Sequence, residues 1–219
     1  MTARTYSGDQ ISTMDLPDWR SIHEYLEARF LTRDFATGLR FVDRVGAAAE
    51  AANHHPDLTL RYAHVTVRLM SHDVFAKTQR DVELARTISA IAADMAVEAD
   101  PSAAARVEIG LDTWDAAEIK PFWKAVLGLD DHPRFDSDLR DLDADLPTLW
   151  FQECDRHDLP AQRFHLDIRV PPEVGPARIA AALAAGGTVV STEFAPRFTV
   201  LADPQGNKVC VCTHDGRDD

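Results

Sequence analysis

The sequence predicts an α+β protein built from two small domains. Its 219 residues exceed the size of one typical domain, which is about 100 to 150 residues. Strand-like and helix-like patterns alternate along the chain with short connections. Residues 100–105 (DPSAAA) have the small, polar, proline-bearing composition of a linker. We therefore expect one domain at residues 1–99 and a second at residues 106–214.

The first half begins with strands and a long helix. Apolar residues alternate loosely over residues 19–30, which predicts one or two short strands. Asp34 can cap a helix, and apolar residues then recur every three or four positions, so we expect a helix over residues 35–52. Asn53 tolerates the left-handed conformation that ends a helix, and Pro56 disfavours its continuation.

A second strand and helix follow. Residues 62–71 alternate with period two, and His72 lies at the end of this strand. Thr78 and Asp81 form a capping-box pattern at the start of a second long helix. An antiparallel sheet covered on one face by both helices would bury both apolar stripes.

The second half repeats a simple order of elements. Residues 107–111 alternate as a strand, and a helix is expected from Asp115 to Leu127, ended by Gly128. A strand over 164–170, a helix over 176–185 and further strands follow. This order predicts two related modules of one strand, one helix and several strands.

The composition of the chain excludes several classes of function. The net charge of −13 opposes binding to nucleic acid or to an anionic membrane surface, so a small-molecule substrate is expected. No apolar run is long enough to span a membrane, and no export signal is visible. The three cysteines follow no zinc or secreted-scaffold spacing, which indicates a reducing compartment. We expect a soluble cytoplasmic enzyme.

Histidines and acidic residues form a spaced pattern in the first half. Glu50 precedes the sequence His54-His55-Pro56, His72 follows the second strand, and Asp81 lies in the second helix. Over residues 16–98 this pattern resembles the pterin-4a-carbinolamine dehydratases. The resemblance implies that His54 and His72 transfer protons and that His55 positions the substrate. We place Glu50 and Asp81 at the substrate site, while a solvent-facing Glu50 and a purely helix-capping Asp81 remain alternatives.

Histidine suits the implied reaction. When a 4a-hydroxytetrahydropterin loses water to give a quinonoid dihydropterin, the hydroxyl must gain a proton and a ring nitrogen must lose one. The unperturbed pKa of histidine, about 6.5, leaves both protonation states populated near neutral pH. No metal or organic cofactor is expected for this 4a-hydroxytetrahydrobiopterin dehydratase reaction.

The second half carries its own resemblance. Residues 115–128 (DAAEIKPFWKAVLG), 163–168 (RFHLDI) and 201–211 (LADPQGNKVCV) resemble the glyoxalase/bleomycin-resistance/dioxygenase superfamily, also called vicinal oxygen chelate. The resemblance implies a paired βαβββ domain with a cupped sheet. Metal-using members take ligands from positions that match Glu108, Gln152, His165 and Cys210. Because this set mixes hard oxygens with a thiol, we favour a cup without metal.

Two functions remain as alternatives to the dehydratase reaction, and we also expect the protein to self-associate. The chemistry could instead lie in the second domain, as a metal-dependent lyase, isomerase or dioxygenase. The protein could also be a non-enzymatic binding or coactivator-like protein, since some members of the dehydratase family resemble dimerisation cofactors of transcription factors. By resemblance, we expect a homodimer or homotetramer.

Overall fold

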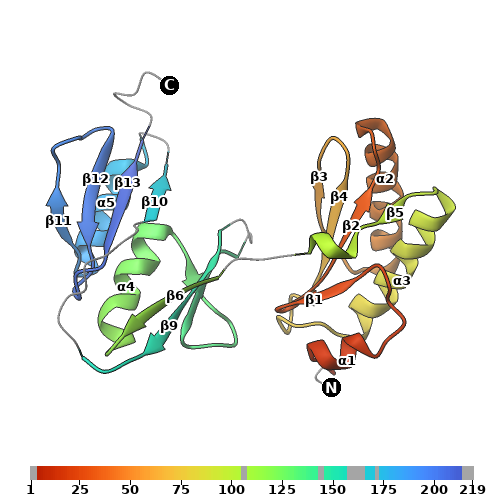
Figure 1. Ribbon diagram of the computed structural model, residues 1–219, viewed down its shortest axis with the longest axis horizontal. Helices are drawn as coiled ribbons and strands as arrows, with labels where there is room; N and C mark the ends of the chain where they lie inside the picture. Colours follow the sequence, from red (N-terminus) through yellow and green to blue (C-terminus); the bar gives the residue numbers. More distant parts are fainter. Residues whose placement is uncertain (1–3, 105–107, 143–145, 157–165, 171–172, 214–219) are drawn as a thin grey trace. The chain divides into compact units, whose positions relative to one another are not determined.

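The computed structural model describes residues 4–104, 108–142, 146–156, 166–170 and 173–213. The chain divides into two compact units, Met1–Arg106 and Val107–Asp219 (Figure 1). The division lies at the C-terminal end of the linker predicted at residues 100–105. Most of that segment belongs to the first unit. Pro101–Ala103 form a short 3-10 helix, η1, and the backbone N–H of Asp100 donates to the carbonyl of Arg29 at 2.7 Å.

The first unit contains an antiparallel sheet in the order β1-β2-β4-β3, with β5 paired to β2. Its strands are β1 (Arg20–Ile22), β2 (Tyr25–Leu31), β3 (Asp57–Leu60), β4 (Val65–Leu69) and β5 (Glu98–Ala99). A short helix, α1 (Gly8–Ser12), precedes the sheet. Register pairs Ala28 of β2 with Val67 of β4, so their side chains share one face.

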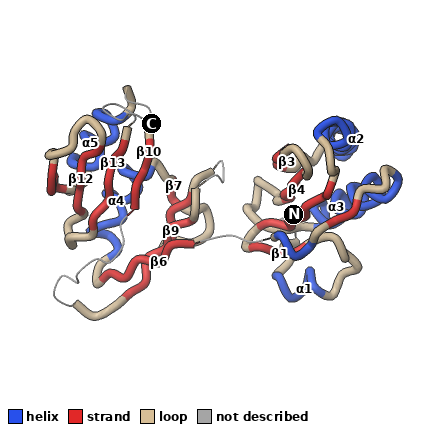
Figure 2. The backbone as a smooth tube through the Cα atoms, turned by 45° about the horizontal axis from the view of Figure 1, so that its top comes forward, coloured by secondary structure: helices blue, strands red, loops and turns tan. Residues whose placement is uncertain are grey.

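Two long helices cover one face of this sheet. They are α2 (Phe35–Ala52) and α3 (Gln79–Asp94), and Figures 1 and 2 show both on the same side. Their apolar stripes meet the sheet in one core, which includes Phe30, Phe41, Val67 and Ile88, each fully buried. The predicted antiparallel sheet with helices on one face is thus confirmed.

The second unit contains two four-stranded sheets of matching topology, in the orders β6-β9-β8-β7 and β10-β13-β12-β11. In each sheet the strand that comes first along the chain pairs in parallel with the strand that comes last along the chain, β6 with β9 and β10 with β13. The other pairs are antiparallel. The first sheet comprises β6 (Glu108–Thr113), β7 (Asp130–Asp131), β8 (Asp138–Arg140) and β9 (Thr148–Glu153). The second comprises β10 (Leu166–Arg169), β11 (Thr188–Ser191), β12 (Phe198–Ala202) and β13 (Lys208–Cys212).

One helix follows the first strand of each module. These helices are α4 (Ala116–Leu127) and α5 (Gly175–Ala184), so both modules run βαβββ as the sequence predicts. A single core unites the modules: Phe122 of α4 packs in a cluster with Leu149 of β9 and Leu201 of β12. A hydrogen bond of 2.9 Å from Trp123 Nε1 to Asp203 Oδ2 also joins them.

No helix within the described residues is long and apolar enough to cross a membrane.

Candidate active site

The end of α2 places His54. Asn53 adopts φ 46° and ψ 43°, the left-handed conformation that ends the helix, as the sequence predicts. The backbone N–H of His54 then donates to the carbonyl of Ala49 at 3.1 Å. This turn directs the His54 ring into the protein, where only 6% of the residue is exposed.

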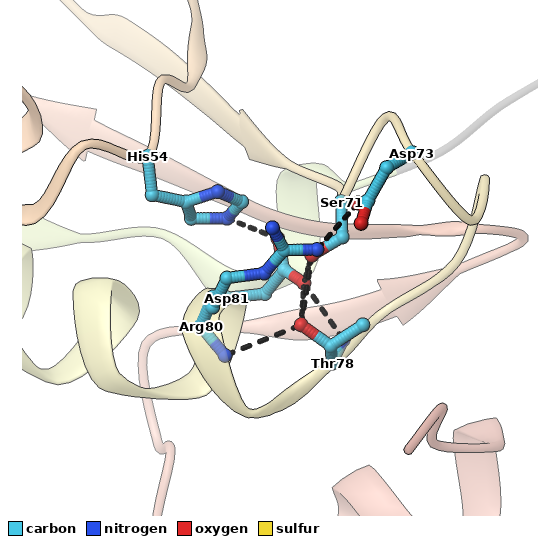
Figure 3. A network of polar contacts seen from close by, with 6 residues as sticks. All are labelled: His54, Ser71, Asp73, Thr78, Arg80 and Asp81. Atoms are coloured by element: carbon cyan, nitrogen blue, oxygen red, sulfur yellow. Dashed lines mark hydrogen bonds and ion pairs between the residues drawn. The ribbon is translucent and has the colours of Figure 1, made fainter. Parts of the chain in front are cut away.

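A buried carboxylate receives that ring. His54 Nε2 lies 2.7 Å from Oδ1 of Asp81, in the first turn of α3 (Figure 3). The second oxygen, Oδ2, accepts hydrogen bonds from the Thr78 backbone N–H at 2.7 Å and from Ser71 Oγ at 2.8 Å. Asp81 is 0% exposed. A carboxylate enclosed in this way holds its protein partners in place, and it presents no surface to a bound molecule.

His55 lies on the other side of the extended segment. Its Nε2 atom is 3.1 Å from Oε1 of Glu50, and both side chains are largely exposed. Consecutive residues of an extended chain point in opposite directions, which separates His55 from the buried His54. Glu50 is therefore placed to orient His55.

A short turn carries His72. We call residues 71–76 the His72 turn; it is closed by a bridge between Ser71 and Ala76. His72 is exposed and directly follows Ser71, whose hydroxyl is bound to Asp81. The backbone thus ties His72 to the carboxylate that holds His54.

An ion pair fixes the same turn to α3. Arg80 donates a hydrogen bond to Asp73, as Figure 3 shows. This hydrogen bond lowers the pKa of Asp73, and the positive charge of Arg80 lowers it further. The Asp73 carboxylate is therefore ionised near neutral pH and keeps the turn attached to the helix.

Four of the five predicted site residues form two contacting pairs, and His72 belongs to neither pair. His54 and Asp81 meet directly, and His55 meets Glu50. In the described part of the chain no hydrogen bond joins the rings of His54, His55 and His72. Sequence reasoning missed Ser71, although its position next to His72 and within reach of a helix start was a usable signal.

The three candidate ligands of the second unit that the structure describes do not gather into a metal site. Glu108 and Gln152 are exposed on β6 and β9, and the register sets them four pairs apart. Cys210 of β13 is buried, which raises the pKa of its thiol to about 11, with a hydrogen bond to Asp167 adding to the effect. His165 lies outside the described residues. No group of three or more His, Cys, Asp or Glu side chains in the described residues could hold a metal ion. A thiol that stays protonated is a poor metal ligand, so the described candidates do not fit a metal ion.

An antiparallel sheet covered by two helices, with a buried histidine–aspartate pair, defines a dehydratase-like first unit. The paired βαβββ modules define a glyoxalase-like second unit. Residues 5–91 match the family described as pterin 4 alpha carbinolamine dehydratase, and residues 108–212 match the glyoxalase-like domain family. The chain belongs to the pterin-4a-carbinolamine dehydratase family through its N-terminal half, and its C-terminal half is a glyoxalase-like domain.

Two curated relatives carry the name "Putative pterin-4-alpha-carbinolamine dehydratase". The protein from Thermosynechococcus vestitus is 44% identical over 78 residues, which span 36% of this chain and 82% of the relative. The protein from Nocardia farcinica is 39% identical over 94 residues, which span 42% of this chain and 99% of the relative.

Solved structures resemble each half separately. A transcriptional coactivator/pterin dehydratase from Brucella melitensis is 27% identical, with a TM-score of 0.39, covering 41% of this chain and 99% of that protein. A glyoxalase/bleomycin resistance protein/dioxygenase family enzyme from Burkholderia phytofirmans is 18% identical, with a TM-score of 0.39, covering 48% of this chain and 95% of that protein.

Proposed function

We propose that this protein dehydrates a 4a-hydroxytetrahydropterin to the quinonoid dihydropterin, with histidines as acid and base. The observation that carries the proposal is the buried hydrogen bond between His54 Nε2 and Asp81 Oδ1, at 2.7 Å. A histidine fixed by a carboxylate in this way has one ring nitrogen committed to orientation and the other ready to exchange a proton.

His54 acts as the base in this proposal. With Nε2–H donated to Asp81, the lone pair lies on Nδ1, which takes the proton from the ring nitrogen of the substrate. The positive charge that forms on His54 is stabilised by the ionised Asp81 beside it. Burial strengthens this effect, because few water molecules compete for the charge.

His72 acts as the acid. It is exposed at the start of the His72 turn, so it can exchange protons with solvent between turnovers. The proton that it donates joins the hydroxyl at C4a, and the C–O bond breaks to release water. The electron pair of the deprotonated nitrogen forms the new carbon–nitrogen double bond. One proton is given and one is taken, so the step balances without a cofactor.

His55 and Glu50 hold the substrate from another side. Their 3.1 Å contact fixes the His55 ring while leaving both side chains accessible. The names of the curated relatives support a pterin as the substrate. Asp81 supports the reaction only through His54 and Ser71.

The location and the assembly of the protein are part of the same proposal. The three cysteines are free, which fits a reducing compartment such as the cytoplasm. We also propose self-association into a homodimer or homotetramer through the first unit, which size-exclusion chromatography with light scattering would test.

The decisive experiment is a dehydration assay on the full chain. We expect His54→Ala and His72→Ala each to lower kcat by about a hundredfold or more, since a positioned acid or base typically contributes that much. His64→Ala is the matched control, because His64 is a half-buried histidine outside the two contacting pairs. Wild-type rates in both site variants would refute the mechanism.

A further inference from the structure

Phe75 has a backbone conformation that its side chain does not favour. Its φ is 46°, in the left-handed region. Glycine adopts this region freely, asparagine and aspartate tolerate it, and a bulky aromatic residue there is an outlier. The residue lies in the His72 turn, two positions before Lys77.

The other strained residues have ordinary structural reasons. Four more non-glycine residues in the described chain have a positive φ: His23, Arg33, Asn53 and Ala96. Asn53 ends α2, Ala96 follows the end of α3, and His23 and Arg33 lie in connections at the two ends of β2. Phe75 differs because it lies in the turn that also carries a proposed catalytic residue.

One tight turn carries both Phe75 and His72. The Ser71 backbone N–H donates to the Ala76 carbonyl at 3.0 Å, and Val74 N–H donates to the Ser71 carbonyl at 3.1 Å. His72 and Phe75 are the next residues inward from the Ser71–Ala76 bridge. Both side chains therefore project from the same tight turn of the backbone.

The turn is held at both ends, so this arrangement is fixed before any ligand binds. Ser71 is bound to Asp81, and Asp73 to Arg80. Directly after the turn, the Lys77 ammonium group donates to the carbonyl of His23. Backbone strain persists only where the surrounding structure enforces it, and strained residues concentrate at functional sites.

We propose that Phe75 contacts the bicyclic ring of the substrate and sets the affinity of the site for it. This inference rests on the proposed dehydratase function. Phe75 is half-buried and lies in the same tight turn as the acid His72. A flat aromatic side chain there would stack on, or meet edge-on, the flat heterocycle from which His72 releases water.

Steady-state kinetics of the full chain test the proposal. We expect Phe75→Leu to raise KM about threefold to tenfold, because the aromatic contact is lost, with kcat within about twofold of wild type. Phe75→Tyr keeps the ring and should keep KM. Phe75→Gly removes the ring and relieves the backbone strain at the same time. If Phe75→Leu does not fold, Phe75→Gly should show the same rise in KM.

Ala96→Gly is the matched control. Ala96 is exposed and has φ 52°, so glycine relieves comparable strain away from the site. We expect it to leave KM unchanged and to raise Tm by about 2–4 °C. Wild-type KM values for both Phe75→Leu and Phe75→Gly would overturn the role of Phe75 alone. If wild type and Ala96→Gly both fail to dehydrate the pterin, the proposed function fails, and the role of Phe75 fails with it.

Discussion

Oδ1 of Asp81 contacts the His54 ring, while Oδ2 of the same carboxylate accepts the backbone N–H of Thr78, the N-cap of α3. One side chain thus joins the start of α3 to the residue that follows α2. The orientation of His54 therefore depends on an intact helix cap. In the proposed mechanism His54 acts on the substrate, and Asp81 only holds His54 in place.

Replacing Asp81 should affect both activity and stability. We expect Asp81→Asn to lower kcat at least tenfold, because a neutral amide stabilises the charged His54 ring poorly. The free energy of unfolding should fall by about 1–3 kcal/mol, because the buried Ser71 hydroxyl and the cap lose their ionised acceptor. Assay kinetics and urea denaturation measure the two effects.

Ser71→Ala is the control for that substitution. It removes one hydrogen bond to Oδ2 and leaves the contact between His54 and Oδ1 intact. A loss of about 1 kcal/mol with kcat within about threefold of wild type is expected. Equal kcat losses in the two variants would contradict the special role of the contact with His54.

Replacing Glu50 should affect substrate binding and hardly affect stability. Its side chain is 80% exposed and that of His55 is 56% exposed, and such surface pairs contribute little. We expect Glu50→Gln to raise KM about twofold to fivefold while kcat and Tm stay near wild type. Glu83→Gln, an exposed glutamate on α3, serves as the control. A large fall in kcat with unchanged KM would instead place Glu50 in the proton transfer.

The thiols of the second unit should differ in reactivity. Cys210 and Cys212 are buried, whereas Cys154 is partly exposed. At pH 8 we expect a thiol reagent to label Cys154 in the native protein and all three cysteines after unfolding. Rapid native labelling of Cys210 would show that its thiol is accessible.

Alkaline pH should destabilise the second unit through Cys210. Burial raises the pKa of this thiol from 9.0 to about 11 in the fold, so the unfolded chain releases the proton at lower pH. The associated stability is complete below about pH 8 and is lost as pH rises through 9 toward 11. Cys210→Ala should flatten that part of the stability curve, and a curve unchanged by the substitution would rule the assignment out.

A cavity in the hydrophobic core of one unit should destabilise that unit and leave the other unit unaffected. Phe41 is fully buried in the first unit and Phe122 is fully buried in the second. Each substitution to alanine should cost about 3–5 kcal/mol in its own unit. Calorimetry should show Phe122→Ala shifting one transition while dehydratase activity at 25 °C persists, and Phe41→Ala shifting the other. A single transition moved equally by both variants would show that the units unfold together.

Local signals made much of the fold predictable. The bounds of α2 follow from the Asp34 cap and the left-handed Asn53, and the structure has the helix at Phe35–Ala52, as predicted. The start of α3 follows in the same way from the capping box of Thr78 and Asp81. Caps act within a few residues, so the sequence contains what is needed to find them.

Elements that depend on distant partners were not predicted. The strand β3 is four residues long and β7 is two, and each exists because it pairs with a neighbouring strand. Segments this short carry no clear period. The composition of residues 100–105 suggested a linker, yet Asp100 followed by Pro101 is a helix-start signal, and the structure forms η1 there.

The sequence could nominate candidate site residues, but it could not predict the contacts that they make. Spacing identified His54, His55 and His72, but which carboxylate meets which ring depends on how α3 packs beside the end of α2. That packing buries Asp81 beneath His54 and leaves Glu50 at the surface. The sequence alone could not show whether Glu50 or Asp81 binds His54, because both acids lie within reach of a histidine.

Because Asp81 both caps a helix and partners a histidine, natural selection would retain it for two separate reasons. A descendant of this protein that lost its enzymatic role would still gain stability from the carboxylate. An aspartate at this position therefore says little about whether a related protein turns over a substrate. The solvent-facing His72, which the fold does not use in this way, is the more telling residue to inspect.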